Sequence, residues 1–577
     1  MQNENNEDTK DQEIGKFFTT DKGTFYSSAD GAVFVSSPLK VIATTHDEKD
    51  GSYGRLLEFT TTYGKTKRWA MPAELLEDMT ALRRELRIQG VEIPAWNKFT
   101  KELFAKYMQQ PAPRDFMICV HQLGWCAGNR YVLPDAVVGN DADKVVLQTA
   151  SRAVDGYAMA GTLDGWREGV GAKARFNDVL MLCIASQFAG PLLKLVNSEG
   201  GGVHIYGGSS RGKSTCADAA CSVWGKGTEH RKSWNTTTVG LEMAAVQYND
   251  NTITLDEINE ADPKHIGNII YAIGNGVGRM RGAKSGGAAP LMRWNCFAVS
   301  TGEKKIKQYI QEQSKSEHMA GMETRMLEIC ADGYRYNVLD DLHGAKDGEA
   351  FGEQLRGAWA KHHGVAGREY LQHLTLDGRN WAEEWRKYKD YHEFNRPTIS
   401  GQERRAAGRF ALIAMAGELA TDYGLTDWDA GMATDCAGRM FDRWLEGRDG
   451  EGDSEQHKAK NAILSFINLH GDTRFSDESL KFQTAVHDRA GWWSEGFSGD
   501  REYWFHVDGL KAALRGIDYK RAKEALINCG LMRTFTRTKD GKEVVEDQRA
   551  VKISGATKRV HVIDINAMDK QSNEGME

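Results

Sequence analysis

The sequence lacks the paired cysteines that bind zinc. Its nine cysteines are scattered from Cys119 to Cys529, and no two of them form a C-x-x-C pair. This pattern fits reduced thiols and gives no zinc signature. The sequence also has no apolar run as long as a membrane span, and its polar, acidic start differs from a signal peptide. We therefore expect a cytoplasmic protein with no membrane partner.

An excess of positive charge is also absent. The chain has 74 Lys and Arg against 81 Asp and Glu, so its formal net charge is −7. This balance argues against a protein that coats DNA uniformly, although local basic patches can hide inside an acidic total. At 577 residues the chain is too long for one core, and three or four domains are expected.

One stretch, GGSSRGKST at residues 207–215, matches the phosphate-binding pattern G-x-x-x-x-G-K-[ST]. Residues 202–206 predict a buried strand before it, and 214–223 a helix after it. This order makes ATP the expected ligand, and an ordinary Gly/Ser turn is the alternative. The expected nucleotide-binding residues are Gly207, Gly208, Ser209, Ser210, Arg211, Gly212, Lys213, Ser214 and Thr215. In such loops the lysine binds the β- and γ-phosphates and the serine hydroxyl binds Mg²⁺.

A second apolar strand, residues 252–255, ends in Asp256 and Glu257 about forty residues after the loop. Parallel strands place such a tip beside the phosphate-binding loop. Asp256 is therefore expected to bind Mg²⁺ with Ser214, and Glu257 to polarise the attacking water. A pair of acids ending a strand by chance is the alternative.

A third strand, residues 294–299, ends in Ser300 and Thr301. In ATPases with an additional strand, a polar residue at this tip senses the γ-phosphate, and Thr301 is our choice for that role. A Ser-Thr turn that caps the next helix explains the same residues.

Between these strands lies a glycine-rich segment, residues 274–287, that carries Arg279, Arg281 and Lys284. A basic, flexible insert at this position suits a loop that lines the pore of a ring and binds DNA phosphates. An arginine that reaches a neighbour's ATP and a plain solvated loop are the alternatives.

Further arginines follow downstream. Arg325 precedes an apolar stretch and is our candidate for an arginine that acts on the ATP of an adjacent subunit, with a strand-capping surface residue as the alternative. Residues 402–419 form a strongly helical segment at the place of a helical lid. Its Arg404, Arg405 and Arg409 do not single out a nucleotide sensor, and ordinary helix surface is the better expectation for each.

The rest of the sequence indicates how the chain divides into domains. Helices predicted at 459–467, 507–514 and 518–529 indicate a winged-helix-like C-terminal domain. Residues 501–560 hold 14 basic against 8 acidic residues, which favours DNA contact over protein docking. The expected divisions are a disordered tail at 1–14, an N-terminal α+β domain at 15–155, a P-loop ATPase domain at 156–400, a helical lid at 401–445, a linker at 446–457 and the winged-helix-like domain at 458–577.

Between about residues 34 and 445 the chain resembles the domain-of-unknown-function 927 family of phages and mobile elements. The resemblance rests on GW at 124–125 with VLPD at 132–135, GTLDGW at 161–166, AGPLL at 189–193, the loop at 207–215, LDE at 255–257, NG at 275–276 with Gly278 and Arg281, STGE at 300–303 and AGELA at 416–420. It implies a P-loop ATPase of the replication-helicase kind, which longer relatives link to a primase. This chain carries no such primase at its N-terminus, so a separate primase is a candidate partner.

Together these observations predict an α/β P-loop NTPase core of the additional-strand kind, similar to AAA+ ATPases and superfamily 3 helicases. The first hypothesis is an ATP-dependent DNA helicase or translocase that uses ATP and Mg²⁺ and forms a homo-oligomeric ring such as a hexamer. It would act in the replication of a phage or mobile element on single-stranded or forked DNA. The alternative is a switch that does not unwind DNA, such as an initiator, loader or defence protein. A docking scaffold with a degenerate ATPase is a third reading, against which intact Lys213, Asp256 and Glu257 weigh.

Overall fold

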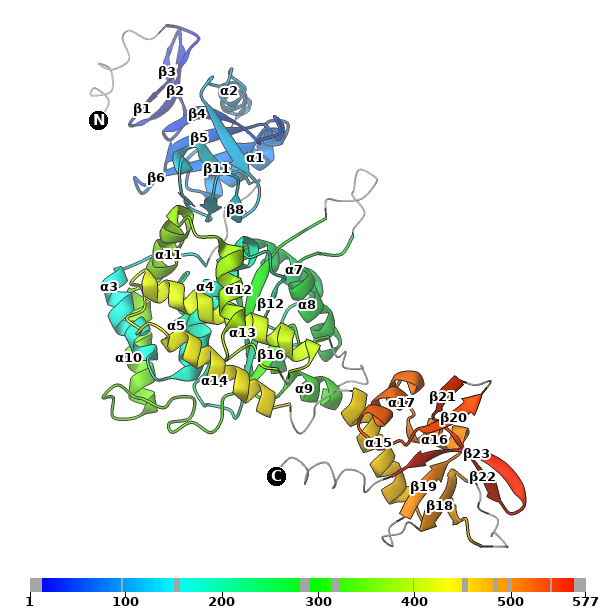
Figure 1. The fold of residues 1–577 in the computed structure, drawn as a ribbon. Coiled ribbons are helices and arrows are strands. Elements are labelled where there is room, and N and C mark those ends of the chain that lie inside the picture. Colours follow the sequence, from blue (N-terminus) through cyan, green and yellow to red (C-terminus); the bar gives the residue numbers. More distant parts are fainter. Residues whose placement is uncertain are drawn as a thin grey trace. The chain divides into compact units, whose positions relative to one another are not determined.

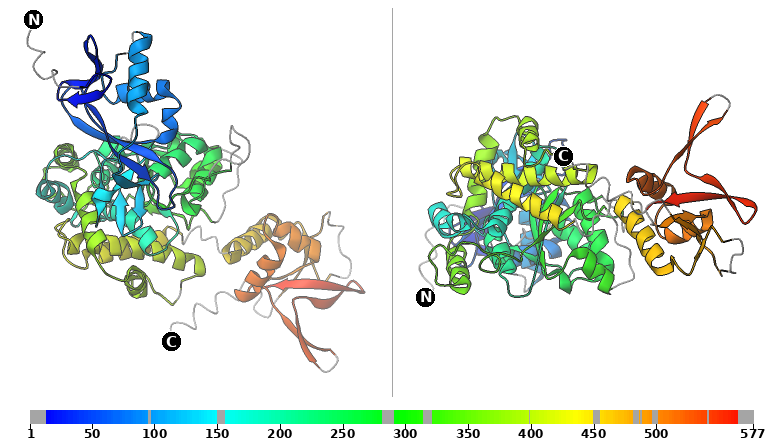
Figure 2. Two further views of the ribbon diagram at one scale, coloured as in Figure 1. Left: turned by 90° about the horizontal axis from the view of Figure 1, so that it is seen from above. Right: turned by 60° about the horizontal axis from the view of Figure 1, so that its bottom comes forward.

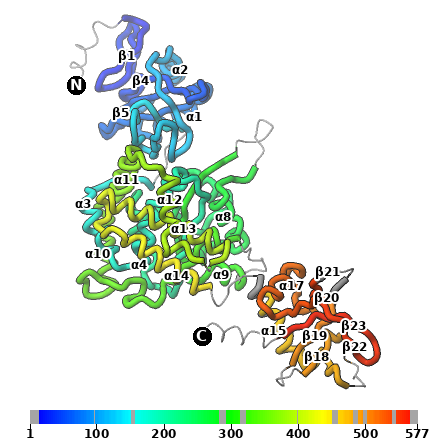
Figure 3. The backbone as a smooth tube through the Cα atoms, in the orientation of Figure 1, coloured from blue at the N-terminus to red at the C-terminus, as the bar shows by residue number. Residues whose placement is uncertain are grey.

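A computed structural model describes most of the chain, and the backbone of each part can be followed in Figures 1 and 3. The described residues are 13–94, 97–149, 156–280, 291–313, 321–397, 399–448, 455–480, 486, 488–495, 501–539 and 542–564. The chain divides into two compact units, Met1–Gly447 and Arg448–Glu577. This boundary lies inside the predicted linker at 446–457.

The first unit begins with β-structure. A three-stranded antiparallel sheet is followed by a five-stranded sheet of order β11-β7-β4-β5-β6. The strands are β1 (Phe17–Thr20), β2 (Gly23–Ser28), β3 (Gly31–Ser36), β4 (Leu39–His46), β5 (Gly54–Thr60), β6 (Thr66–Pro72), β7 (Phe116–Val120) and β11 (Val145–Leu147). Helices α1 (Met79–Ile88) and α2 (Lys98–Met108) bury Leu82, Leu86, Leu103 and Phe104 in the core of this region. Helix α1 begins at Met79, because Asp78 caps it and residues 73–76 form a separate 3-10 turn.

A small sheet joins this region to the rest of the unit. It has the order β10-β9-β8, with β8 (Gly124–Cys126), β9 (Arg130–Val132) and β10 (Val137–Val138). Trp125 and Tyr131 belong to the main hydrophobic core, and they donate hydrogen bonds to the carbonyls of Pro191 and Asp250. This sheet therefore packs with the central domain, although the sequence analysis grouped it with the N-terminal one.

The central domain is built on a five-stranded parallel sheet of order β13-β14-β15-β12-β16. Its strands are β12 (Gly201–Tyr206), β13 (Lys232–Ser233), β14 (Asn251–Asp256), β15 (Cys296–Gly302) and β16 (Met326–Cys330). The predicted strands are thus present, with small shifts at their ends. β15 lies between β12 and β14, which is the inserted strand that the sequence analysis expected.

Helix α4 (Asp178–Leu195) packs against β14, β15 and α5 (Lys213–Cys221). Among the described residues it alone is long and apolar enough to cross a membrane, and most of it is buried in the protein core. It begins at Asp178, shortly after Phe176, which has a left-handed φ of 62° and an exposed side chain. On other parts of the sheet, α8 (Pro263–Asn275) packs against β12 and β15, and α7 (Thr238–Gln247) packs on α8.

Long helices complete the first unit. In Figures 1 and 2, α13 (Gly401–Asp422) and α14 (Met432–Glu446) lie side by side, and both pack on α4. α13 starts at a capping box formed by Ser400 and Glu403. The other helices here are α3 (Leu163–Trp166), α6 (Gly227–His230), α9 (Ile306–Gln313), α10 (Gly348–Lys361), α11 (Val365–Leu376) and α12 (Trp381–Asp390).

The second unit has a five-stranded sheet of order β17-β18-β19-β23-β22 and a separate hairpin, β20-β21. Its strands are β17 (Phe475–Asp477), β18 (Gly491–Glu495), β19 (Arg501–Phe505), β20 (Phe535–Lys539), β21 (Lys542–Glu546), β22 (Arg549–Ile553) and β23 (Ala556–Ile563). Three helices, α15 (Glu455–His470), α16 (Val507–Ala513) and α17 (Tyr519–Asn528), share a core with residues of β17, β19 and β23. The three predicted helices are confirmed within a few residues at each end.

Candidate functional site

The phosphate-binding pattern lies between the end of β12 and the start of α5. Gly212 occupies the N-cap position of α5 with a left-handed φ of 100°, which favours glycine. It offers no side chain to accept from the first N–H groups of the helix, whereas Thr237, Asp262 and Asp347 cap their helices with side-chain oxygens. A helix start with free N–H donors attracts an anion.

Lys213 is buried at the start of α5, with 7% of its surface exposed. Its Nζ donates to the carbonyls of Gly207 at 2.9 Å and Gly208 at 2.7 Å. Burial lowers the pKa of Lys213, and the nearby carboxylates of Glu257 and Glu303 oppose that shift. The lysine therefore places a positive charge, stabilised by acids, directly beneath the loop.

At the end of β14, the carboxylate of Asp256 accepts hydrogen bonds from three side chains. Oδ1 accepts from Ser214 Oγ at 3.1 Å and from Thr301 Oγ1 at 2.5 Å. Oδ2 accepts from Nη1 of Arg231 at 2.5 Å. The structure thus brings together the serine, the acid and the threonine that the sequence analysis selected from three separate segments.

Arg231 also links Asp256 to a second acid. Its Nε lies 3.3 Å from Oδ1 of Asp218 on α5. Burial raises the pKa of Asp218 to about 6, while Arg231 acts in the opposite direction. An Asp-Arg-Asp chain therefore connects the helix of the phosphate-binding loop to the tip of β14.

Glu257 follows Asp256 in a left-handed conformation with φ 58° and ψ 81°. Such a backbone is unfavourable for a residue with a side chain and is concentrated at functional sites. Its N–H donates to Thr301 Oγ1 at 3.1 Å, and its side chain lines the same cavity as Lys213. Burial raises the pKa of Glu257, which makes it a stronger base.

Ser300, the other residue considered as a sensor, is completely buried. Its Oγ lies 2.8 Å from Nδ1 of His204 and accepts from Nε1 of Trp234 at 2.9 Å. Burial lowers the pKa of His204 to about 4, so this imidazole is neutral at pH 7. Ser300 therefore makes its hydrogen bonds inside the protein core, whereas Thr301 makes hydrogen bonds to Asp256 and Glu257.

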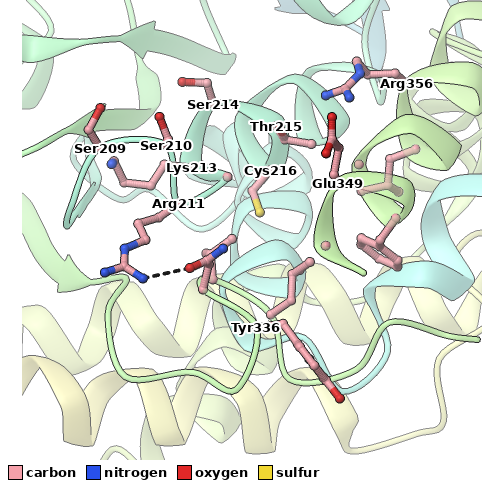
Figure 4. A pocket seen from close by; sticks show the side chains of 18 of the residues that line it. Ser209, Ser210, Arg211, Lys213, Ser214, Thr215, Cys216, Tyr336, Glu349 and Arg356 are labelled. Atoms are coloured by element: carbon pink, nitrogen blue, oxygen red, sulfur yellow. Dashed lines mark hydrogen bonds between the residues drawn. The ribbon is translucent and has the colours of Figure 1, made fainter. Parts of the chain in front are cut away.

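A cavity of about 600 Å³ opens beside the loop (Figure 4). The loop and the start of α5 form one wall, and the segment after β16 with α10 forms the other. Figure 4 shows the dashed hydrogen bond of Arg211, whose Nη1 donates to Asn337 Oδ1 at 2.8 Å. Apolar side chains on the second wall would suit a flat base, and they are Val338, Leu339, Phe351 and Leu355.

Several residues of this site were not predicted from the sequence. Arg356 and Glu349 of α10 line the cavity and are labelled in Figure 4, and Asp332 accepts from the N–H of Gly208 at 3.3 Å. Asp218 follows Ser214 by four residues, so helical spacing could have revealed it. Arg231 and Arg356 carry no such signal, because only tertiary packing brings them to the site.

Arg325 lies at the other end of the strands from the phosphate-binding loop. Its backbone precedes β16 and pairs with Gly202 at the start of β12, so about 20 Å of strand separates it from the loop. Its guanidinium donates to the carbonyl of Gly321 and to Asn275 Oδ1, both at 3.1 Å, and packs over the ring of Tyr271. Arg325 is therefore remote from the cavity of its own chain.

The lid arginines are not at the cavity either. Arg404 and Arg405 are exposed, whereas Arg409 is half-buried and donates to the carbonyl of Gly200 at 3.0 Å. Burial lowers the pKa of Arg409 to about 10. Among the described residues of the cavity wall, the arginines are Arg211 and Arg356.

Only part of the predicted DNA-contacting loop falls within the described residues. Arg279 is exposed, and its Nε lies 4.0 Å from Oε1 of the buried Glu242. Arg281 and Lys284 lie outside the described residues.

The residues present fit a nucleotide with Mg²⁺. The helix start lacks a side-chain cap, a buried ammonium lies under the loop, and a hydroxyl and a carboxylate oxygen meet 3.1 Å apart. Hydroxyl and carboxylate oxygens are the ligands that Mg²⁺ prefers. Within the ranges that the structure describes, no cluster of three or more His, Cys, Asp or Glu side chains forms another metal site.

Comparisons with known proteins agree with the resemblance noted from sequence. Residues 16–293 match a family described as a domain of unknown function, number 927. A solved structure described as Cch of SCCmec type IV, an active helicase, has a TM-score of 0.67 at 19% identity over 97% of this chain and 99% of that one. This likeness shows a shared fold. NtrX from Brucella abortus in complex with ATP matches 50% of this chain and 62% of its own at 10% identity, with a TM-score of 0.18 that is too low to bear on the fold. No curated protein sequence matches.

Proposed function

The chain belongs to the domain-of-unknown-function 927 family, and from this premise we propose that it is an ATP-driven DNA helicase or translocase of a phage or mobile element. The proposal rests on the hydrogen bond of 3.1 Å from Ser214 Oγ to Asp256 Oδ1, which lies beside the buried Lys213. These groups lie beyond the end of β12 and at the tip of β14 in one sheet, and their chemistry matches a triphosphate with its metal ion.

Each residue has a role in this proposal. Lys213 and the N–H groups of residues 207–215 bind the β- and γ-phosphates, and Ser214 with Asp256 holds Mg²⁺. Bound Mg²⁺ would neutralise charge on the triphosphate. Glu257 accepts a proton from the attacking water, and the raised pKa of its carboxyl supports this role. Thr301 fixes the positions of the Asp256 carboxylate and the Glu257 backbone through two hydrogen bonds.

The position of Arg325 supports an oligomeric ring. The guanidinium lies at the end of the strands away from the cavity of its own chain and does not reach its own nucleotide. Its proposed role is therefore to stabilise charge on the ATP of a neighbouring copy. In the ring, Arg279, Arg281 and Lys284 are proposed to contact DNA phosphates, and a separate primase is a candidate partner. The Cch structure, described as an active helicase, favours this motor over the other classes.

The test is ATP hydrolysis by the full chain with and without single-stranded DNA, together with opening of a forked duplex. The proposal expects DNA to raise the hydrolysis rate and the fork to open only with hydrolysable ATP. Stimulation without opening would replace the motor with a partner-exchanging switch. Absence of both effects would contradict the DNA-dependent role.

A further inference from the structure

We propose that the second unit binds duplex DNA through the exposed face of α17, with the cations of the β22–β23 hairpin on the neighbouring phosphates. This inference adds to the proposed motor a second nucleic-acid site that is independent of ATP. It concerns only residues 507–563, far in sequence from the nucleotide site.

The first observation is a helix–turn–helix. α16 and α17 are separated by residues 514–518, where Gly516 has a φ of 90° and Asp518 caps α17 by accepting from the N–H of Arg521 at 3.0 Å. The two helices share one core: Leu510 and Leu514 are buried with Ala522 and Leu526. Two helices joined by a short turn with glycine are the arrangement that presents a second helix to the major groove.

The second observation is the chemistry of the outer face of α17. Its exposed side chains are Lys520, Arg521, Glu524 and Asn528, opposite the buried Ala522 and Leu526. At 3.6 residues per turn these four fall within an arc of about 100°. Each of them can donate or accept hydrogen bonds at base edges or phosphates.

The third observation is the charge of the hairpin next to this helix. Residues 549–563 contain four basic residues and no acidic one, and Arg549, Lys552, Lys558 and Arg559 are all exposed. Ser554 and Gly555 form its turn with φ values of 50° and 83°. Arg559 pairs with Glu546 at 3.0 Å, whereas Lys552 and Lys558 make no ion pair with any side chain that the structure describes.

Two side-chain contacts join α17 to the hairpin. Lys523 Nζ of α17 lies 2.5 Å from Oδ2 of Asp547, just before β22, and the hydroxyl of Tyr519 lies 3.4 Å from Nε2 of His561 on β23. α17 therefore packs along the base of the hairpin, on the face of β23 that carries His561. In the register of β22 and β23, Lys552 and Arg559 share that face, whereas Lys558 lies on the other face with Val551.

Duplex DNA is the occupant that this chemistry favours. A B-form major groove admits an α-helix, whereas the deep, narrow major groove of A-form RNA does not. A surface with unpaired lysines gains affinity from phosphates by releasing counterions, and an acidic protein partner offers no such groove for α17.

The test uses the full chain without nucleotide and a labelled DNA duplex of about 20 base pairs, followed by fluorescence anisotropy over a range of salt. The double variant Lys552→Ala/Arg559→Ala should weaken binding by about tenfold and reduce the slope of log affinity against log salt by about 2, since two phosphate contacts are lost. Lys520→Ala should weaken duplex binding as well. A duplex RNA of the same sequence should bind at least about tenfold more weakly than the DNA.

Lys98→Ala/Lys101→Ala is the matched control, because it removes the same charge from exposed positions of α2. An equal loss in the control pair, unchanged duplex affinity of the hairpin pair, or equal binding of RNA and DNA would overturn the proposal, and unchanged affinity would leave protein docking as the role of this unit. Basal ATP hydrolysis of the hairpin variant should equal that of the wild type, and Lys213→Ala should keep the wild-type duplex affinity. Failure of this surface is thereby distinguished from failure of the proposed motor.

Discussion

The hydroxyl of Ser214 donates a 3.1 Å hydrogen bond to Oδ1 of Asp256, although the two residues are 42 positions apart in sequence. One lies at the start of α5 and the other at the tip of β14. Since both groups are oxygen donors of the kind that Mg²⁺ prefers, this pair defines where the metal ion of a bound nucleotide is expected.

Replacement of the acid tests that pair. Asp256→Asn keeps the shape of the side chain but removes its charge, and it should lower the ATP hydrolysis rate by about 100-fold or more, as loss of one strong electrostatic contact does. The measurement is steady-state hydrolysis over a range of Mg²⁺ concentrations. Asp30→Asn, at an exposed position, is the control and should leave the rate unchanged. Equal rates in the two variants would show that Asp256 does not serve the metal ion.

Thr301 and Ser300 provide a second comparison, because adjacent hydroxyls face different surroundings. Thr301→Val removes the hydrogen bonds to Asp256 and Glu257, so it should slow turnover by about 10-fold to 100-fold while nucleotide affinity stays within about threefold. Ser300→Ala breaks contacts to His204 and Trp234 and should lower thermal stability with a smaller effect on turnover. The opposite pattern would assign the sensor role to Ser300.

The Asp-Arg-Asp chain predicts a pH-dependent loss of stability. The pKa of Asp218 in the folded protein is about 6, above the value of 3.8 for a free aspartate, so its contribution to stability is full below pH 3.8 and is lost as the pH rises through 6. Arg231→Ala removes the cation that compensates the ionised carboxylate. The variant should therefore be destabilised by about 3 kcal/mol above pH 7 and by clearly less at pH 5.

Melting temperatures at pH 5 and pH 7.5 measure this difference. Arg231→Ala/Asp218→Asn should recover part of the stability at pH 7.5, because the unpaired charge is gone. A loss of stability that is the same at both pH values, with no recovery in the double variant, would mean that the ion pair is not what Arg231 contributes.

The proposed action of Arg325 on a neighbouring subunit can be tested with mixed variants. Arg325→Ala should bind ATP normally but hydrolyse it slowly, since its own cavity is intact and remote from the substitution. Mixed with Lys213→Ala, which lacks the lysine but keeps Arg325, it should regain measurable hydrolysis when the two variants share an assembly. A mixture that remains as inactive as its two components would contradict action between subunits.

Strands and loops that carry local patterns could be predicted from the sequence. β12, β14 and β15 are apolar runs with polar tips, and the loop after β12 has a specific spacing, so the position of Ser214 beside Asp256 followed from the rule that parallel strands end at one edge. The helices of the second unit were located by their apolar periodicity in the same way.

Contacts that depend on long-range packing could not be predicted. Arg231 and Arg356 stand in segments without a distinctive pattern, and their roles depend on where α10 and the residues before β13 are placed. The same reason explains why the choice among Arg404, Arg405 and Arg409 stayed open: nothing local in α13 indicates which side chain is buried and which is exposed.

The most direct measurement of the central claim is ATP hydrolysis by the wild type and Lys213→Ala, with melting temperatures of both proteins. The account predicts that the wild type hydrolyses ATP in the presence of Mg²⁺, and that the variant stays folded but has no measurable turnover, because the ammonium under the loop is lost. A folded Lys213→Ala variant that hydrolyses ATP at the wild-type rate would contradict the assignment of the nucleotide site.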